Sequence, residues 1–250
     1  MNYRQSFGNI KAAARRGLEN NYVYAIVLLI QLQFLNILLP YLILVFLPGN
    51  SLFEIITFEI VGLILTALLQ ILQMGSCYFY LKLNCGQTAS VSDLYYGFRT
   101  NRNQALGIGL VYALVSYLCL LPHTYFSYCA TYAGRVTDVR FLFLLLLAGQ
   151  LAKFLLLIPV SQGYYILLDF PDYTAKQALL LSFRMMKGNL LRYLLFALSF
   201  IPLFLLSLLC CGLGLLWVVP YMESSLAAFY LDLAQHNNQK NQAAPQDAPL

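Results

Sequence analysis

The chain has 250 residues, of which 60% are hydrophobic and 10% are charged, with a formal net charge of +5. A soluble domain carries about 25% charged residues, so this chain has too few to cover a globule in water. Several continuous apolar runs reach the roughly 20 helical residues that cross a hydrocarbon core, and they lack the alternation of barrel strands. The composition excludes a soluble domain and predicts an all-α, polytopic helical membrane protein.

Six apolar segments follow one another, and we expect each to be a transmembrane helix. The third is predicted to end at Pro122, which leaves an outer loop over 123–140, and a tight turn near Gly212 separates the last two. The polar segment 235–250 predicts a disordered cytoplasmic tail after a single membrane domain, 1–234. The expected spans are 22–47, 55–81, 106–122, 141–168, 193–211 and 213–231.

The basic residues between these spans predict the orientation of the chain. The N-terminal segment, the loops 82–105 and 169–192 and the tail contain twelve Lys and Arg, whereas the opposite loops contain two, Arg135 and Arg140. Loops rich in Lys and Arg stay in the cytoplasm. We therefore expect a multi-pass protein of a cytoplasmic membrane with both termini inside.

Two polar, basic stretches on the predicted cytoplasmic side have the pattern of short amphipathic helices. In "FPDYTAKQALLLSFRMMKGN" (170–189), Thr174 and Gln177 have the spacing of a capping box, and Gly188 is a stop signal. The stretch "GQTASVSDLYYGFRTNRN" (86–103) follows the same plan. Such helices lie in the membrane interface with basic side chains toward anionic headgroups. The basic side chains expected there are Arg99, Arg102, Lys176, Arg184 and Lys187.

The spacing of these stretches allows two interpretations. Arg16, Arg99 and Arg184 lie 83 and 85 residues apart, each before a pair of apolar segments, as in three parallel repeats of an amphipathic helix and a hairpin. Alternatively, any cytoplasmic loop between hairpins is basic and amphipathic without a repeat. Under both, the aromatic residues that end the spans, such as Tyr78–Tyr80 and Phe229–Tyr230, are expected at the headgroup level.

Three ionisable residues fall inside the predicted spans: Glu59, Lys153 and Glu223. A charge within lipid costs at least about 2.5–3.5 kcal/mol, so it usually faces the helix bundle. Counted from the outer ends of their spans, Lys153 and Glu223 lie at about 18 and 15 Å, whereas Glu59 lies near the surface. The sequence predicts an intramembrane charge pair of Lys153 and Glu223, either structural or part of a transport site.

Three segments together resemble a known family. They are "GSCYFYLKLNCGQTASVSDLYYGF", "YYILLDFPDYTAKQALLLSFRMMKGN" and "CCGLGLLWVVPYMESSLAAFYLDL", and their motif residues are Asp172, Gly188, Pro220, Tyr221 and Asp232. The chain resembles DUF975, a family of uncharacterised bacterial integral membrane proteins, although residues 120–160 depart from its pattern. The resemblance implies a multi-pass protein of the bacterial cytoplasmic membrane and supplies no mechanism.

The residue types do not form a catalytic constellation. No His lies near Ser224 and Ser225, and the cysteines lack ligand spacing, so we expect no enzyme, cofactor or metal site. Basic residues follow one membrane face, a pattern that does not favour a nucleic-acid partner. We hypothesise a non-enzymatic protein that organises the membrane or binds a partner, either lipid, anionic at the cytoplasmic face, or protein. The alternative is a transporter of a small solute or ion, with a site between even-numbered spans near Glu223; a water-accessible cavity there would favour it.

Overall fold

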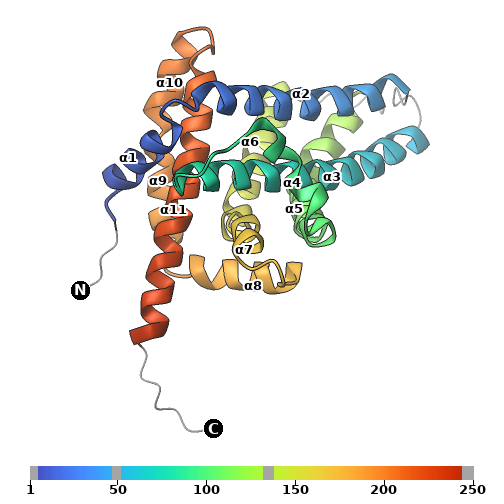
Figure 1. Cartoon of the computed structure of the whole chain (residues 1–250). Helices are drawn as coiled ribbons and strands as arrows, with labels where there is room; N and C mark the ends of the chain where they lie inside the picture. Colours follow the sequence, from blue (N-terminus) through green and yellow to red (C-terminus); the bar gives the residue numbers. More distant parts are fainter. Residues whose placement is uncertain (1–4, 47–51, 132–137, 244–250) are drawn as a thin grey trace.

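In the computed structural model, which describes residues 5–46, 52–131 and 138–243, every regular element is a helix. Helices pair their own backbone groups, as lipid requires. The elements range from 3 residues in η2 to 33 residues in α3 (Figure 1). The elements are α1 (Phe7–Leu18), α2 (Tyr22–Phe46), α3 (Leu52–Asn84), η1 (Val91–Tyr95), α4 (Tyr96–Arg99), α5 (Arg102–Thr131), α6 (Val139–Leu157), η2 (Ile158–Val160), α7 (Gly163–Asp169), α8 (Ala175–Met186), α9 (Leu190–Leu198), α10 (Ile201–Leu209) and α11 (Leu215–Ala243).

Within these ranges, five helical segments are long and apolar enough to cross a membrane. They are Tyr22–Leu42, Ile56–Asn84, Arg102–Ala130, Val139–Asp169 and Leu190–Leu209. The predicted sixth span is a helix, α11, but it is not among the five. Its polar residues, Glu223, Ser224, Ser225 and Asp232, reduce its apolar character. The chain is therefore an all-helical protein with the apolar helices of a membrane protein.

The short helices precede hairpins of long helices. The element order is α1 before α2–α3, η1 and α4 before α5–α6–α7, and α8 before α9–α10–α11; α2 and α3 lie side by side in Figure 1. A residue with a left-handed backbone separates each short helix from the next long one: Asn20 (φ 67°), Asn101 (φ 54°) and Gly188 (φ 82°). This order is compatible with a repeat and with three unrelated amphipathic loops.

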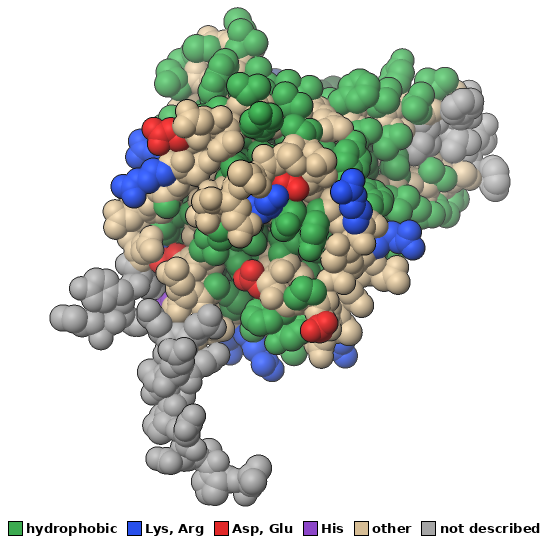
Figure 2. Space-filling model, in the orientation of Figure 1, with side chains coloured by type: hydrophobic (Ala, Val, Ile, Leu, Met, Phe, Trp, Pro, Cys, Tyr) green, Lys and Arg blue, Asp and Glu red, His purple; other side chains and the backbone are tan. Residues whose placement is uncertain are grey.

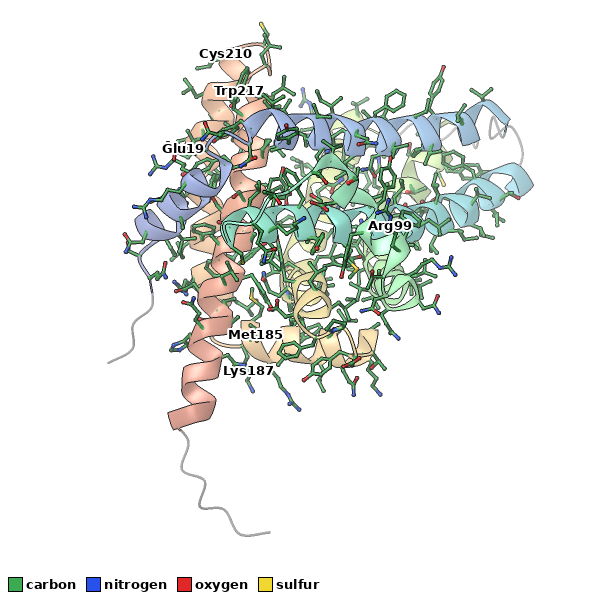
Figure 3. The ribbon with its side chains drawn as sticks, viewed as in Figure 1. Glu19, Arg99, Met185, Lys187, Cys210 and Trp217 are labelled. Carbon is green, nitrogen blue, oxygen red and sulfur yellow. The ribbon has the colours of Figure 1, made fainter. Side chains whose placement is uncertain are left out.

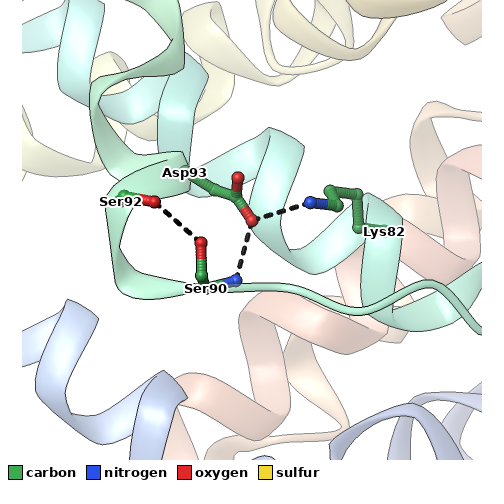
Figure 4. Close-up of polar contacts among 4 residues, drawn as sticks. All are labelled: Lys82, Ser90, Ser92 and Asp93. Carbon is green, nitrogen blue, oxygen red and sulfur yellow. Dashed lines mark hydrogen bonds and ion pairs between the residues drawn. The ribbon is translucent and has the colours of Figure 1, made fainter.

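The predicted capping signals form. Thr174 N–H donates to Gln177 Oε1 at 2.9 Å, and Gln177 N–H donates to Thr174 Oγ1 at 3.3 Å, so the capping box of α8 is complete. Before η1, Ser90 N–H donates to Asp93 Oδ2 at 2.8 Å, and Lys82 Nζ on α3 pairs with the same oxygen at 3.0 Å (Figure 4). This ion pair fastens η1 to the end of α3.

Buried side chains concentrate where the short helices meet the adjoining ends of the long ones. We call this region the base: α1, η1, α4 and α8 with residues 67–84, 102–116, 157–169, 190–200 and 224–236. The opposite ends of the hairpins, which we call the tips, carry exposed apolar side chains such as Ile37, Leu121 and Leu209. Figure 2 shows the upper edge of the molecule covered by hydrophobic side chains, with charged ones below it.

Three aromatic doublets predicted for the headgroup level lie inside the base rather than at its surface. These doublets are Phe79–Tyr80 on α3, Tyr164–Tyr165 on α7 and Phe229–Tyr230 on α11, and all six side chains are buried. The rings of Tyr165 and Tyr230 stack with centroids 5.0 Å apart. The prediction that these rings form an interfacial belt is wrong, because position and ring type do not distinguish a headgroup contact from a helix contact.

Helix boundaries differ from the predicted spans in two places. α5 continues through Pro122 to Thr131, so the described part of the predicted outer loop is helical up to that residue. Next to this proline, the ring of His123 contacts the Leu142 carbonyl on α6 at 3.1 Å. α11 continues to Ala243, so 235–243, predicted as a disordered tail, is helical; the rest of that tail lies outside the described residues.

The fourth and fifth predicted spans are each broken near a proline. α6 passes through η2 into α7 around Pro159, and α9 gives way to α10 at Ser199 and Phe200, just before Pro202. Breaks free backbone carbonyls, and helices of the base satisfy them: Ser182 on α8 donates to the Pro159 carbonyl, and Lys11 Nζ on α1 donates to the Ser199 carbonyl at 3.2 Å. Burial and the nearby Arg15 lower the pKa of Lys11.

Candidate polar cavity within the helix bundle

A cavity of about 540 Å³ lies between the long helices on the side of the base that faces the tips. Its walls come from α3, α5, α6, η2, α7, α9 and α11. Its polar lining side chains are Gln70, Gln73, Cys77, Tyr112, Gln150, Lys153, Ser161, Gln162, Tyr164, Tyr165, Tyr193 and Glu223. Such a polar lining is unusual among helices apolar enough to enter a membrane, where every polar group has a cost.

The broken segment between α6 and α7 supplies the most enclosed polar group. Gln162 is 1% exposed, and its Nε2 donates to Ser161 Oγ at 2.8 Å, while Ser161 Oγ donates to the Ile158 carbonyl at 2.7 Å. Gln162 Oε1, by contrast, is buried without a hydrogen-bond partner. Across the cavity, Tyr164 Oη donates to Gln70 Oε1 at 3.4 Å. An acceptor therefore stands unpaired in the wall of the cavity.

The two predicted partners, Lys153 and Glu223, both line this cavity. No ion pair between them is found among the residues that the structure describes, where the ion pairs are Lys82–Asp93 and Arg192–Asp232. The aromatic doublets explain the separation. Counted from the stacked Tyr165 and Tyr230, Lys153 is twelve residues away and Glu223 seven. Lys153 is therefore further along the chain from the stacked rings than Glu223 is, and the helix break at η2 lies between Lys153 and Tyr165. Counting from the outer ends missed this offset.

One wall of the cavity is not covered by protein. Gln150 and Phe154 on α6 line the cavity and are also exposed, and Lys153 is half-buried. Phe143 and Leu147, on the same side of α6 nearer the tip, are exposed as well. The cavity is therefore open along α6, which is one of the helices apolar enough to cross a membrane.

The basic side chains predicted for the cytoplasmic surface are all exposed at the base: Arg99, Arg102, Lys176, Arg184 and Lys187. Beside them, Phe98 and Phe183 are also exposed. In Figure 3, Lys187 lies at the opposite end of the molecule from Cys210 and Trp217 at the tip of α10 and α11. We call these exposed cationic and aromatic side chains the rim; they do not line the cavity.

The motif residues lie around the base. Asp172 is exposed before α8. Gly188 has a left-handed backbone, and a Cβ at this position would meet no atom within 4 Å. Pro220 lies inside α11, followed by Tyr221, whose ring meets Phe200 edge-on at 5.5 Å. Asp232 pairs with Arg192 at 2.7 Å and accepts the Gln5 N–H at 3.1 Å. These residues support the base and do not line the cavity.

Most of the cavity lining was not predicted. A signal was present: Gln70 and Gln73 on α3, and Gln150 and Lys153 on α6, are polar pairs three residues apart within apolar segments. Residues at that spacing share a helix face. Two such faces, with Glu223, would have indicated a polar interior. Gln162 could not be found this way because the helix break sets its direction.

In the described ranges, no three His, Cys, Asp or Glu side chains come close enough to hold a metal ion. No curated protein and no solved structure matches this sequence. The family model DUF975, "Protein of unknown function", matches residues 1–237. Because this match covers nearly the whole chain, the protein belongs to the DUF975 family.

Proposed function

We propose that this chain is a non-enzymatic, multi-pass membrane protein that binds a lipid by its headgroup in the cavity. The observation that carries the proposal is the cavity itself, which places Glu223, Lys153 and side-chain amides around about 540 Å³ among membrane-compatible helices. Pockets for small ligands typically measure about 300–1,000 Å³. Polar groups inside a membrane are stabilised by a polar partner, and a headgroup supplies one.

The exposed wall along α6 favours a lipid as the ligand. Gln150 and Phe154 are reached both from the cavity and from outside the protein. A headgroup that enters through this wall leaves its acyl chains against Phe143 and Leu147, in the bilayer. The cavity then has to accommodate only the headgroup of the lipid.

We further propose that α11 is a sixth span and that both termini are cytoplasmic in a bacterial cytoplasmic membrane. The twelve basic residues against two on the opposite side support this orientation. The cysteines offer a test, since Cys85 at the base and Cys210 and Cys211 at a tip are exposed. A membrane-impermeant maleimide should label Cys210 and Cys211 on intact cells, and Cys85 only after permeabilisation. Labelling of Cys85 on intact cells would contradict this orientation.

The exposed rim of Arg99, Arg102, Lys176, Arg184 and Lys187 is a second lipid contact in this proposal. A Lys or Arg near an anionic leaflet gains about 1 kcal/mol. The neighbouring Phe98 and Phe183 can enter the headgroup region. The rim holds the base at the cytoplasmic surface, either on anionic lipid or on an acidic protein partner.

A transporter is the second candidate. The cavity at Glu223 is the feature expected for a transporter, and a helix break favours it as well. The break at Pro159 lies beside the cavity, and transporter sites are commonly built at such interruptions. The same lining would hold a polar solute. A transporter must also open the cavity to water on both sides, so solute uptake into proteoliposomes separates the two candidates.

The test fills the cavity and measures bound lipid. Leu226, which lines the cavity, is changed to Trp, and Leu206, exposed on α10, is changed to Trp as the matched control. Native mass spectrometry of protein released from lipid nanodiscs should show lipid on the wild type and the control and a loss of at least tenfold for Leu226→Trp. Equal lipid retention by a folded Leu226→Trp protein would refute the proposal.

A further inference from the structure

The charges in the cavity are arranged by depth. Gln162 and Glu223 lie toward the aromatic doublets of the base, three and seven residues from Tyr165 and Tyr230 respectively. Lys153, twelve residues from Tyr165, lies toward the tips. The inner end of the cavity therefore presents acceptors, the Glu223 carboxylate and the unpaired Gln162 Oε1, and the outer end presents an ammonium donor.

Lys153 and Glu223 do not pair with each other. Both line the cavity from different helices, α6 and α11, and no ion pair joins them in the part of the chain that the structure describes. A charge in a low-dielectric interior is strongly destabilised unless an opposite charge and hydrogen bonds compensate it. The cavity volume between them leaves room for a molecule that supplies both.

From this arrangement we infer that the ligand is a zwitterion whose cationic group lies against Glu223 and Gln162 and whose anionic group lies against Lys153. This inference rests on the proposed function and names the headgroup class. A ligand with only a cation would leave Lys153 without a partner and repel it, and a ligand with only an anion would do the same to Glu223. A zwitterion compensates both, and its net charge of zero matches the net charge of the pair.

An amine donor also suits the inner end better than a quaternary ammonium. A primary ammonium has hydrogens for the Glu223 carboxylate and for the Oε1 of Gln162, which is buried and has no hydrogen-bond partner within the protein. A trimethylated nitrogen would leave that oxygen without a donor. The matching headgroup has a primary amine and a phosphodiester, as in phosphatidylethanolamine, and the same chemistry in free form is phosphoethanolamine.

The experiment compares lipids on the full chain in nanodiscs that contain equal amounts of phosphatidylethanolamine and phosphatidylglycerol. Native mass spectrometry should find the amine lipid retained at least tenfold over phosphatidylglycerol by the wild type. Glu223→Gln should lower retention of the amine lipid at least tenfold without lowering that of phosphatidylglycerol, whereas Lys153→Met should lower both. Glu59→Gln is the matched control, because Glu59 is a half-buried acid on α3 that does not line the cavity.

A ligand-side arm keeps the test independent of folding of the variants. N-acetylation of phosphatidylethanolamine removes its positive charge, so the wild type should retain this lipid at least tenfold less. Equal retention of the acetylated and free-amine lipids would overturn the inference and leave the proposed lipid binding intact. Retention that Leu226→Trp does not affect would instead refute the proposed function. Free phosphoethanolamine that raises the unfolding temperature of wild type but not of Glu223→Gln would support the zwitterion site with a soluble source.

Discussion

At the base, Phe196 stacks on Phe229 at 5.2 Å and meets Phe200 edge-on at 5.5 Å, and all three rings are fully buried. At the tips, apolar residues such as Leu206 and Leu209 are exposed. The sequence is apolar in both regions, so hydrophobicity does not explain the difference. Lipid tails are as apolar as leucine, and burial of a leucine away from lipid provides little driving force. Close packing, hydrogen bonds and ion pairs hold the base.

The cavity lies at the border between these two regions. Its inner wall is formed by residues of the base, such as Gln162 and Tyr193, whereas its outer wall includes the exposed residues Gln150 and Phe154. A rigid inner wall can hold a polar group in a fixed position, and an open outer wall allows it to enter from the membrane. If the base and the tips differ in packing as described, substitutions in the two regions should differ in their effect on stability.

The largest difference is expected between Phe196→Ala at the base and Leu209→Ala at a tip. Truncation of a buried Phe leaves a cavity and costs about 3–5 kcal/mol. Leu209 is 82% exposed, and a change at such a site usually stays within about 0.5 kcal/mol. Thermal and denaturant unfolding of the protein in the same detergent would measure both. Similar losses for the two variants would show that the tips are packed in solution, which would remove the basis of the comparison.

The ion pair of Arg192 and Asp232 is expected to give the next largest effect. The Asp232 side chain is 4% exposed, and Arg192 Nη2 also donates to the Gln5 carbonyl at 2.9 Å. Arg192→Met leaves a buried carboxylate without its partner, which costs about 3–5 kcal/mol, whereas replacement of both partners with apolar residues can be nearly neutral. We expect Arg192→Met with Asp232→Leu to recover most of the unfolding free energy. A double variant whose loss equals the sum of the single losses would contradict a coupled pair.

The sequence predicted the class of fold well because apolar runs, caps and basic loops are local signals. The capping box at Thr174 and the turn at Gly188 formed where their spacing placed them. Helix continuity was harder to predict. Pro122 was expected to end a helix and does not, while Pro159 and Pro202 lie at breaks. The outcome depends on which neighbour satisfies the freed carbonyls, and Ser182 and Lys11 are distant in sequence.

The candidate site was predicted only in part for the same reason. Glu223 and Lys153 stand out in apolar segments, and both line the cavity. Their separation depends on where the helices are held together, which is at the buried aromatic doublets of the base. The predicted depths of Lys153 and Glu223 were counted from the tips, and the tips do not fix how the two helices are aligned with each other. The role of Gln162 depends on the break before α7 and was not visible in the periodicity.

A smaller effect is expected where the glycines of α3 approach their neighbours. A Cβ on Gly75 would overlap the backbone carbonyl of Leu94 in η1, whereas a Cβ on Gly62, nearer the tip, would overlap the hydroxyl at the end of the Tyr117 side chain. Overpacking typically costs about 1–3 kcal/mol, so Gly75→Ala should destabilise by that amount. Gly62→Ala should cost less, since a tyrosine side chain can rotate away. Gly8→Ala in α1, where the nearest atom is 3.7 Å away, serves as the control. Equal unfolding temperatures for all three variants would show that η1 is not held against α3.

The smallest effect concerns the rim, where single charges act on lipid. Arg99→Gln and Arg184→Gln should each weaken binding to vesicles that contain anionic lipid by about 1 kcal/mol, without a change in unfolding temperature, because both side chains are exposed. Arg140→Gln is the matched control, since Arg140 is an equally exposed arginine at the tip end of α6. Lipid binding should weaken as salt rises, because about 8 Å of screening length at physiological ionic strength shortens to about 3 Å at 1 M. Binding would be measured by flotation of the protein, after its release from nanodiscs, with anionic and with neutral vesicles. If Arg140→Gln weakens binding as much as Arg184→Gln, the charge acts through the net charge of the protein, and the base has no special contact with the anionic leaflet.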